Sequence, residues 1–167
     1  MKFDYAKWKA REPDTRVKDV MVMGMWGGNA RQTGALRLGM KPSAGSTTGK
    51  YSLLAAQADH TYKTGDSGYH SGFCSDGKWH HVCMTYDSAN HVLNAYLDYT
   101  TCVCSISPEG GLMIPDMNEA YYIVNGGLNF AAGDFEIDEV RLSRKLLTPE
   151  EMLHFAKPET GMVFIFK

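Results

Sequence analysis

The chain has 167 residues, of which 44% are hydrophobic and 22% are charged, and its formal net charge at pH 7 is -2. This size and composition are typical of one soluble globular domain with a hydrophobic core. The charges form no basic stripe, so nucleic acid is not expected as a partner, and the apolar runs are too short for insertion into a membrane.

Strand-forming segments separated by turn residues follow one another along the first half of the chain. Residues 20–26 are apolar on both alternating faces, which predicts a buried central strand. Residues 35–40 and 51–56 predict two further strands, joined by a loop rich in Ser, Thr and Gly. Residues 59–77 are polar and rich in Gly, which predicts a long loop or an irregular edge hairpin. Loops of this length often carry function.

The clearest hairpin lies in the middle of the chain. Residues 79–86 predict a strand, residues 87–90 a turn, and residues 91–98 the returning strand. We expect the two strands to pair antiparallel with one alternating set of side chains facing inward, and we expect Trp79 to pack in the core. The inward set consists of Val82, Met84, Tyr86, Leu93, Ala95 and Leu97.

The C-terminal half adds more strands and one helix. Further strands are predicted at residues 101–106, 121–124, 135–142 and 162–166. Thr148 and Glu151 flank a proline in the pattern of a capping box, which predicts a short helix over residues 149–156. The element pattern therefore predicts an all-β fold, a two-sheet antiparallel sandwich with one short C-terminal helix, as a single domain over residues 1–167.

Four cysteines are present, and none belongs to a C-x-x-C pair, so a structural zinc site is not expected. Cys74, Cys83, Cys102 and Cys104 could form one or two disulfides in an extracellular protein, or could pack as small reduced side chains. On regular strands Cys102 and Cys104 share a face. We expect Cys83 to lie near one of them, close enough to oxidise.

Two stretches of the chain resemble the laminin-G-like modules, which have a concanavalin-A-like jelly-roll fold. The first is Asp76-Gly77-Lys78-Trp79-His80-His81-Val82 with the strand at 93–98, similar to the family's Gly-x-Trp-His-x-Val and Tyr-x-Asp-Gly strands. The second is residues 135–144 with residues 146–151, similar to the closing Ile-Asp-Glu-Val-Arg strand and its helix. The resemblance implies a jelly-roll sandwich and an extracellular or cell-surface location.

The chain also departs from the family pattern at two places. Tyr99 stands where the family usually has a turn glycine after Asp98, so that turn is expected to differ. The family has one more strand before the region of Trp8. We therefore expect a domain that either lacks this N-terminal strand or is a piece of a larger protein.

A glucanase site is the main enzymatic alternative, because related jelly-roll glucanases carry their carboxylates on one strand. Glu136 and Asp138 share a face of the predicted strand, as such a pair requires. The next positions that could supply the acid are Val140 and Arg141, and neither is a carboxylate. The sequence therefore predicts no catalysis.

Calcium is the cofactor that the resemblance allows, because many jelly-roll modules hold a structural Ca²⁺ through oxygen ligands. Asp138 is the carboxylate of the family motif that could reach such an ion. Its alternative role is a hydrogen bond to a neighbouring loop. His80 and His81 are adjacent and so face opposite sides of a strand, which predicts that they do not share a metal ion.

Sugar binding needs exposed aromatic rings beside polar groups. The candidate residues are Trp26, Asn29 and Arg31 at one strand end, and Tyr62, Tyr69 and His70 in the long loop. The sequence therefore favours a non-catalytic binding or adhesion module for a carbohydrate or glycoprotein. The alternatives are an accessory domain of a secreted enzyme without a free ligand and, last, a glycoside hydrolase. The sequence leaves the oligomeric state open.

Overall fold

The fold is seen in a computed structural model of the chain. The structure describes residues 2–4, 20–26, 35–42, 49–67, 76–113, 121–125, 135–136, 138, 143, 145–148 and 151. In this part of the chain the elements are almost entirely strands, and every pair of neighbouring strands is antiparallel. Within the same residues no helix is long and apolar enough to cross a membrane.

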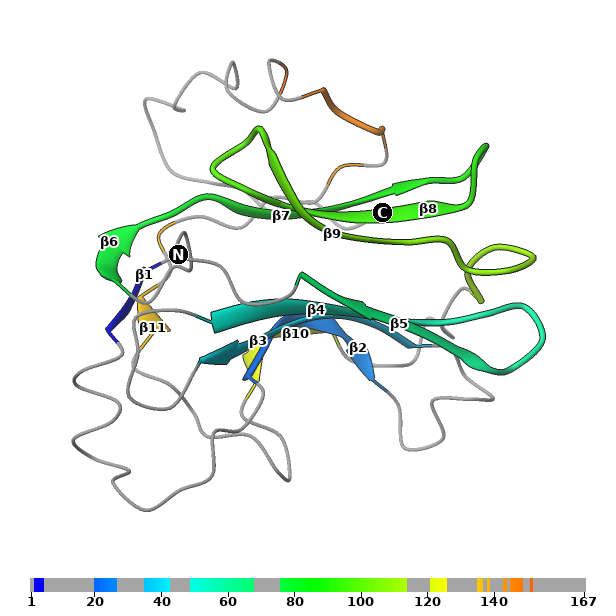
Figure 1. Ribbon diagram of the computed structural model, residues 1–167, viewed down its shortest axis with the longest axis horizontal. Coiled ribbons are helices and arrows are strands. Elements are labelled where there is room, and N and C mark those ends of the chain that lie inside the picture. The colour runs from blue at the N-terminus through cyan, green and yellow to red at the C-terminus, as the bar shows by residue number, and fades with distance from the viewer. Residues whose placement is uncertain are drawn as a thin grey trace.

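One layer is a five-stranded sheet with the order β10-β2-β3-β4-β5. Its strands are β2 (Val20–Trp26), β3 (Ala35–Pro42), β4 (Gly49–Ala56), β5 (Tyr62–Asp66) and β10 (Tyr121–Asn125). The segment predicted as a long loop or edge hairpin therefore contains a regular edge strand, β5. Figure 1 shows this sheet as the lower layer of the molecule.

The facing layer is a three-stranded sheet made of β7 (Val82–Asp87), β8 (Val92–Leu97) and β9 (Thr101–Ile106). The predicted hairpin is confirmed in register, because Val82 pairs with Leu97, Met84 with Ala95 and Tyr86 with Leu93. The three β8 residues of this set are buried, and the three β7 residues are half-buried and pack against the same core.

A second three-stranded sheet, with the order β11-β1-β6, lies at one end of the sandwich (Figure 1). Its strands are β1 (Lys2–Asp4), β6 (Asp76–Trp79) and β11 (Phe135–Glu136). The continuous strand predicted over residues 79–86 is therefore divided between β6 and β7. The break falls at His80 and His81, where the chain passes from the small sheet into the upper layer.

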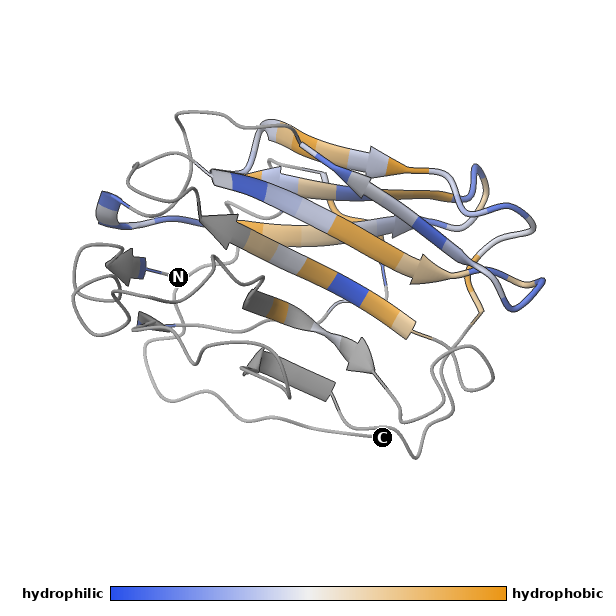
Figure 2. Ribbon diagram, turned by 60° about the horizontal axis from the view of Figure 1, so that its bottom comes forward, coloured by the Kyte–Doolittle hydropathy of each residue, from blue (hydrophilic) through white to orange (hydrophobic). Residues whose placement is uncertain are grey.

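The main core fills the space between the two layers. Both layers contribute fully buried side chains, including Leu38, Met40, Tyr51 and Leu53 from below and Leu93 and Ala95 from above. Figure 2 shows apolar and polar positions alternating along the strands, as expected for sheets with one buried face. The packing is tight where the layers meet, since a Cβ at Gly65 of β5 would lie 2.5 Å from Ile106 Cγ2 of β9. The all-β, two-layer antiparallel class is thus confirmed.

The prediction that Cys102 and Cys104 share a face is wrong, because the β8–β9 ladder contains a bulge between Ala95 and Tyr96. Cys102 lies opposite Tyr96 and is exposed, whereas Cys104 lies opposite Ala95 and is buried, so the two do not share a face. Cys83 flanks Tyr96 from the other side.

Two strand spacings separate Cys83 from Cys102, about 10 Å between Cα atoms, which is too far for a disulfide. All three of these cysteines are free, and burial raises the pKa of the Cys83 thiol. Cys74 lies outside the described residues.

The capping box predicted before the C-terminal helix is present in the structure. The Thr148 amide donates to Glu151 Oε2 at 2.9 Å, and the Glu151 amide donates to Thr148 Oγ1 at 3.3 Å. Apart from Glu151, the helix predicted over residues 149–156 lies outside the described residues. The strand predicted at residues 162–166 also lies outside them.

Candidate functional site

Most of the side chains predicted to bind sugar lie outside the described part of the chain. These are the side chain of Trp26 and the residues Asn29, Arg31, Tyr69 and His70. Tyr62 is described: it lies on the edge strand β5, is half-buried, and packs against the small apolar cluster of Ala35, Leu54 and Ala56. A sugar platform made of these residues therefore stays a prediction.

The predicted calcium ligand, Asp138, is exposed and follows the end of β11. Among the described residues, no group of three or more His, Cys, Asp or Glu side chains is placed to hold a metal ion. Calcium binding by Asp138, with backbone carbonyls as further ligands, stays a prediction. Glu136 forms an ion pair with Lys2, with 2.9 Å between Nζ and Oε1.

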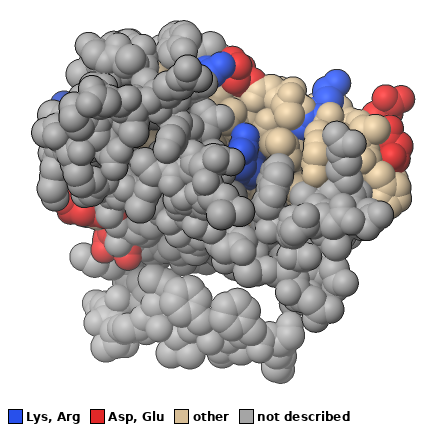
Figure 3. All heavy atoms as spheres, turned by 90° about the horizontal axis from the view of Figure 1, so that it is seen from below, with Lys and Arg blue, Asp and Glu red and all other residues tan. Residues whose placement is uncertain are grey.

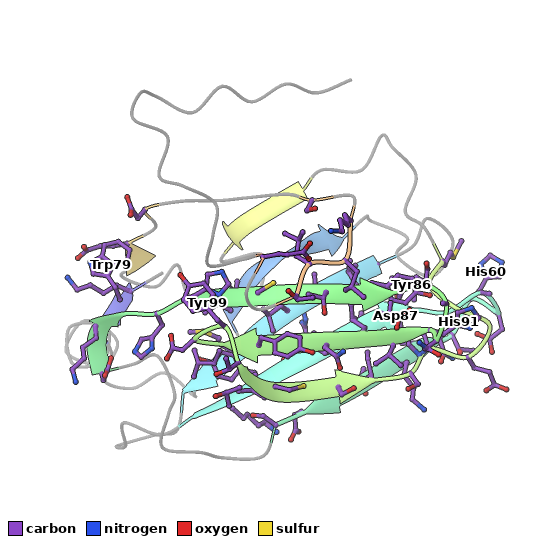
Figure 4. All side chains as sticks on the ribbon, turned by 90° about the horizontal axis from the view of Figure 1, so that it is seen from above. His60, Trp79, Tyr86, Asp87, His91 and Tyr99 are labelled. Carbon is purple, nitrogen blue, oxygen red and sulfur yellow. The ribbon has the colours of Figure 1, made fainter. Side chains whose placement is uncertain are left out.

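Trp79 is a functional candidate whose position was predicted wrongly from the sequence. It was expected in the core, but 53% of its surface is exposed. The reason is the position of β6, which is a separate strand from β7, lies at the edge of the small sheet and ends at Trp79. Figure 4 shows the Trp79 side chain on the outside of the molecule, at one end of the sandwich.

Trp79 is the first member of a row of three side chains across the small sheet. Lys2 lies opposite Trp79 on one side and opposite Glu136 on the other. Residues directly opposite each other in an antiparallel ladder project from the same face, with Cβ atoms about 5 Å apart. We call this set the Trp79 row: an exposed indole ring beside a Lys2–Glu136 ion pair.

The residue after Trp79 anchors this end of β6 to the upper layer. His80 lies between two carboxylates, with Nε2 at 2.9 Å from Asp76 Oδ1 and Nδ1 at 3.0 Å from Asp98 Oδ2. Burial of the ring lowers the His80 pKa, but the hydrogen bonds to Asp76 and Asp98 outweigh this effect, and the pKa is raised above its usual value. Desolvation raises the Asp76 pKa, but the hydrogen bonds to His80 and to the Lys78 amide, together with the nearby positive charges, outweigh it, and the pKa is lowered.

The turn between β8 and β9, where Tyr99 follows Asp98, has a left-handed backbone at two residues that are not glycine. Asp98 and Tyr99 have φ angles of 49° and 69°, in the left-handed region that glycine favours. Tyr99 in this conformation is strained by about 1 kcal/mol. Its ring stacks on His81 with centroids 3.9 Å apart, and the Asp98 carboxylate accepts the His81 amide at 3.1 Å, so neighbouring contacts hold the strained turn.

A second candidate is a half-open cleft of about 520 Å³ over the outer face of the upper layer. Its walls are the outward side chains of β7 and β8 and the segment 146–148, which Figure 1 shows above these strands. The lining residues are Thr85, Asp87, Asn90, Val92, Asn94, Tyr96, Leu146, Leu147 and Thr148.

The polar groups of this cleft are partly used within the protein. The Asp87 carboxylate accepts the amides of Ala89 and Asn90 and the Asn90 side-chain amide, which closes the β7–β8 turn. Thr148 belongs to the capping box. The Trp79 row is therefore the better candidate, because its aromatic ring faces solvent.

No protein-family model, curated protein or solved structure matches the chain. The geometry of the Trp79 row and the two sequence motifs are therefore the basis for assigning a function.

Proposed function

We propose that this chain is a non-catalytic carbohydrate-binding module and that the Trp79 row is its binding surface. The observation that carries the proposal is the exposed indole of Trp79 in register with Lys2 and Glu136. The apolar face of a sugar ring packs on an aromatic side chain, and charged groups beside the ring bind its hydroxyl groups. The resemblance to laminin-G-like modules supports the same class of function and an extracellular or cell-surface location.

The charges of the row favour a neutral sugar. Lys2 and Glu136 form a pair with no net charge, in which the ammonium group donates hydrogen bonds and the carboxylate accepts them. Such a pair can bind adjacent hydroxyl groups, one as acceptor and the other as donor. The described charged side chains on the face shown in Figure 3 also carry both signs.

We expect Trp79→Ala to weaken glycan binding about tenfold or more, because a large exposed aromatic ring at the centre of a binding surface contributes much of the affinity. A glycan array that includes laminarin, xylan and hyaluronan identifies the ligand, and isothermal titration calorimetry then compares the variants. Leu146→Ala is the matched control, since Leu146 is 49% exposed, against 53% for Trp79. This control should bind as the unaltered protein does.

Two results would contradict the proposal. Loss of affinity in Leu146→Ala but not in Trp79→Ala would place the site at the cleft near Leu146. Absence of binding to any glycan would favour the alternative, an accessory domain without a free ligand.

We expect the purified protein to release no more reducing sugar from laminarin or lichenan than a buffer control. A retaining glycosidase needs two carboxyl groups about 5 Å apart, one of which protonates the leaving group. Glu136 is paired with Lys2, and Val140 and Arg141 supply no second acid. Hydrolysis that Glu136→Gln abolishes would show that this strand is catalytic after all.

A further inference from the structure

The geometry around His80 requires a proton on both ring nitrogens. Nε2 faces Asp76 Oδ1 at 2.9 Å and Nδ1 faces Asp98 Oδ2 at 3.0 Å. Ionised carboxylates only accept hydrogen bonds, and a neutral imidazole has one donor and one acceptor nitrogen. Only the imidazolium form can donate to both carboxylates, so loss of a proton replaces one hydrogen bond with a contact between two acceptors.

These two contacts connect separate parts of the fold. Asp76 opens β6, whose last residue is Trp79, and Asp98 lies in the turn between β8 and β9. The connection continues in the backbone, since the Asp98 amide donates to the His81 carbonyl at 2.8 Å. Within the described part of the chain β6 pairs only with β1. Besides the backbone that leads into β7, the His80 side chain therefore attaches the Trp79 strand to the upper layer.

We propose that protonated His80 is a positioning residue of the glycan site, which holds Trp79 in its row, and that its neutral form leaves a site of lower affinity. This inference rests on the proposed function. Its physical reason is preorganisation: a strand that is fixed before binding loses less conformational freedom when the ligand arrives.

The other charged and titratable groups described around His80 do not bridge Asp76 and Asp98 as its ring does. On β6, Lys78 Nζ lies 3.8 Å from Asp76 Oδ2 and is exposed, so it screens Asp76 only weakly. On β1, Lys2 is paired with Glu136. At the turn, Tyr99 and His81 stack on each other and leave the Asp98 carboxylate to His80 and the His81 amide.

The direction of the pH effect follows from the sign of the shift. The His80 pKa in the folded protein is raised above that of the unfolded chain. Its contribution to stability is therefore fully present below the unfolded value of about 6.5 and is lost as the pH rises through the folded value. The affinity of the site should fall over the same pH range.

The test follows the indole N–H signal of Trp79 by NMR between pH 5.5 and 8.5, with no ligand present. Trp79→Phe assigns the signal. We expect it to shift with the same midpoint as the His80 ring signals, above pH 6.5. His80→Gln should abolish this shift, and the control variant His60→Asn should retain it, since Asn tolerates the left-handed backbone of His60, whose φ is 65°.

A second arm measures the affinity for laminarin by calorimetry at pH 6.0 and 8.5. We expect about fivefold weaker binding at the higher pH, the scale of one lost charge-assisted hydrogen bond that is partly exposed, and no such change in His80→Gln. A Trp79 signal that does not follow His80 would overturn the inference. Absence of laminarin binding at both pH values, with a coupled Trp79 signal, would instead count against the proposed function.

Discussion

We expect Leu93→Ala to lower the free energy of unfolding by about 3 kcal/mol, as in other large-to-small core substitutions. Leu93 is fully buried at the centre of the upper layer and belongs to the core that both layers share. Truncation removes apolar contacts and leaves a cavity that the tightly packed sheets cannot close. Urea unfolding under reducing conditions measures the effect.

Val92→Ala provides the control on the same strand. Val92 is half-buried, lies on the opposite face of β8 and lines the open cleft rather than the core. Its truncation should lower the free energy of unfolding by about 1 kcal/mol or less. If the two variants were equally destabilised, the assignment of the inner and outer faces of β8 would be wrong.

We expect Gly24→Ala to destabilise the protein by about 3 kcal/mol, at the upper end of the usual cost of overpacking. Gly24 lies on β2 opposite Arg37 of β3. A Cβ at this position would lie 2.3 Å from the Leu36 carbonyl oxygen and 2.9 Å from the Arg37 Cα. These are backbone atoms within the hydrogen-bonded sheet, so the clash can be relieved only by moving strands.

Gly77→Ala separates this clash from the general cost of replacing a glycine. No atom lies within 4 Å of a Cβ built at Gly77, although its φ is 75°. The expected cost is therefore only the backbone strain, about 1 kcal/mol. Thermal unfolding of both variants should show the larger decrease in Tm for Gly24→Ala, and the reverse order would contradict the close approach of β2 and β3.

The strand register was predictable from the sequence because it depends on alternation within a continuous segment. Val82, Met84 and Tyr86 alternate on one side of a short polar turn, and the returning strand repeats the pattern in phase. With one face buried, a shift of one residue would expose the whole apolar set, so the pattern allows only one register.

The same reasoning failed where the chain leaves the regular pattern. Trp79 was expected in the core on a strand predicted to run unbroken over residues 79–86, but β6 and β7 are separate strands and His80 turns toward Asp76 and Asp98 between them. The bulge beside Tyr96 likewise places Cys102 and Cys104 on different faces, although a regular strand would place them on one. A single irregular residue reverses every face assignment beyond it, and neither a break nor a bulge has a dependable sequence signal.

The sequence by itself determined the all-β class, the hairpin register and the capping box at Thr148, because each depends on residues close together in the chain. Only the tertiary structure decided the Trp79 row and the contacts of His80. Glu136 lies 134 residues from Lys2 along the chain, and Asp98 lies 18 residues from His80. No local pattern relates such partners: pairing of β1 with β6 and β11, and a left-handed turn at Asp98, bring them together.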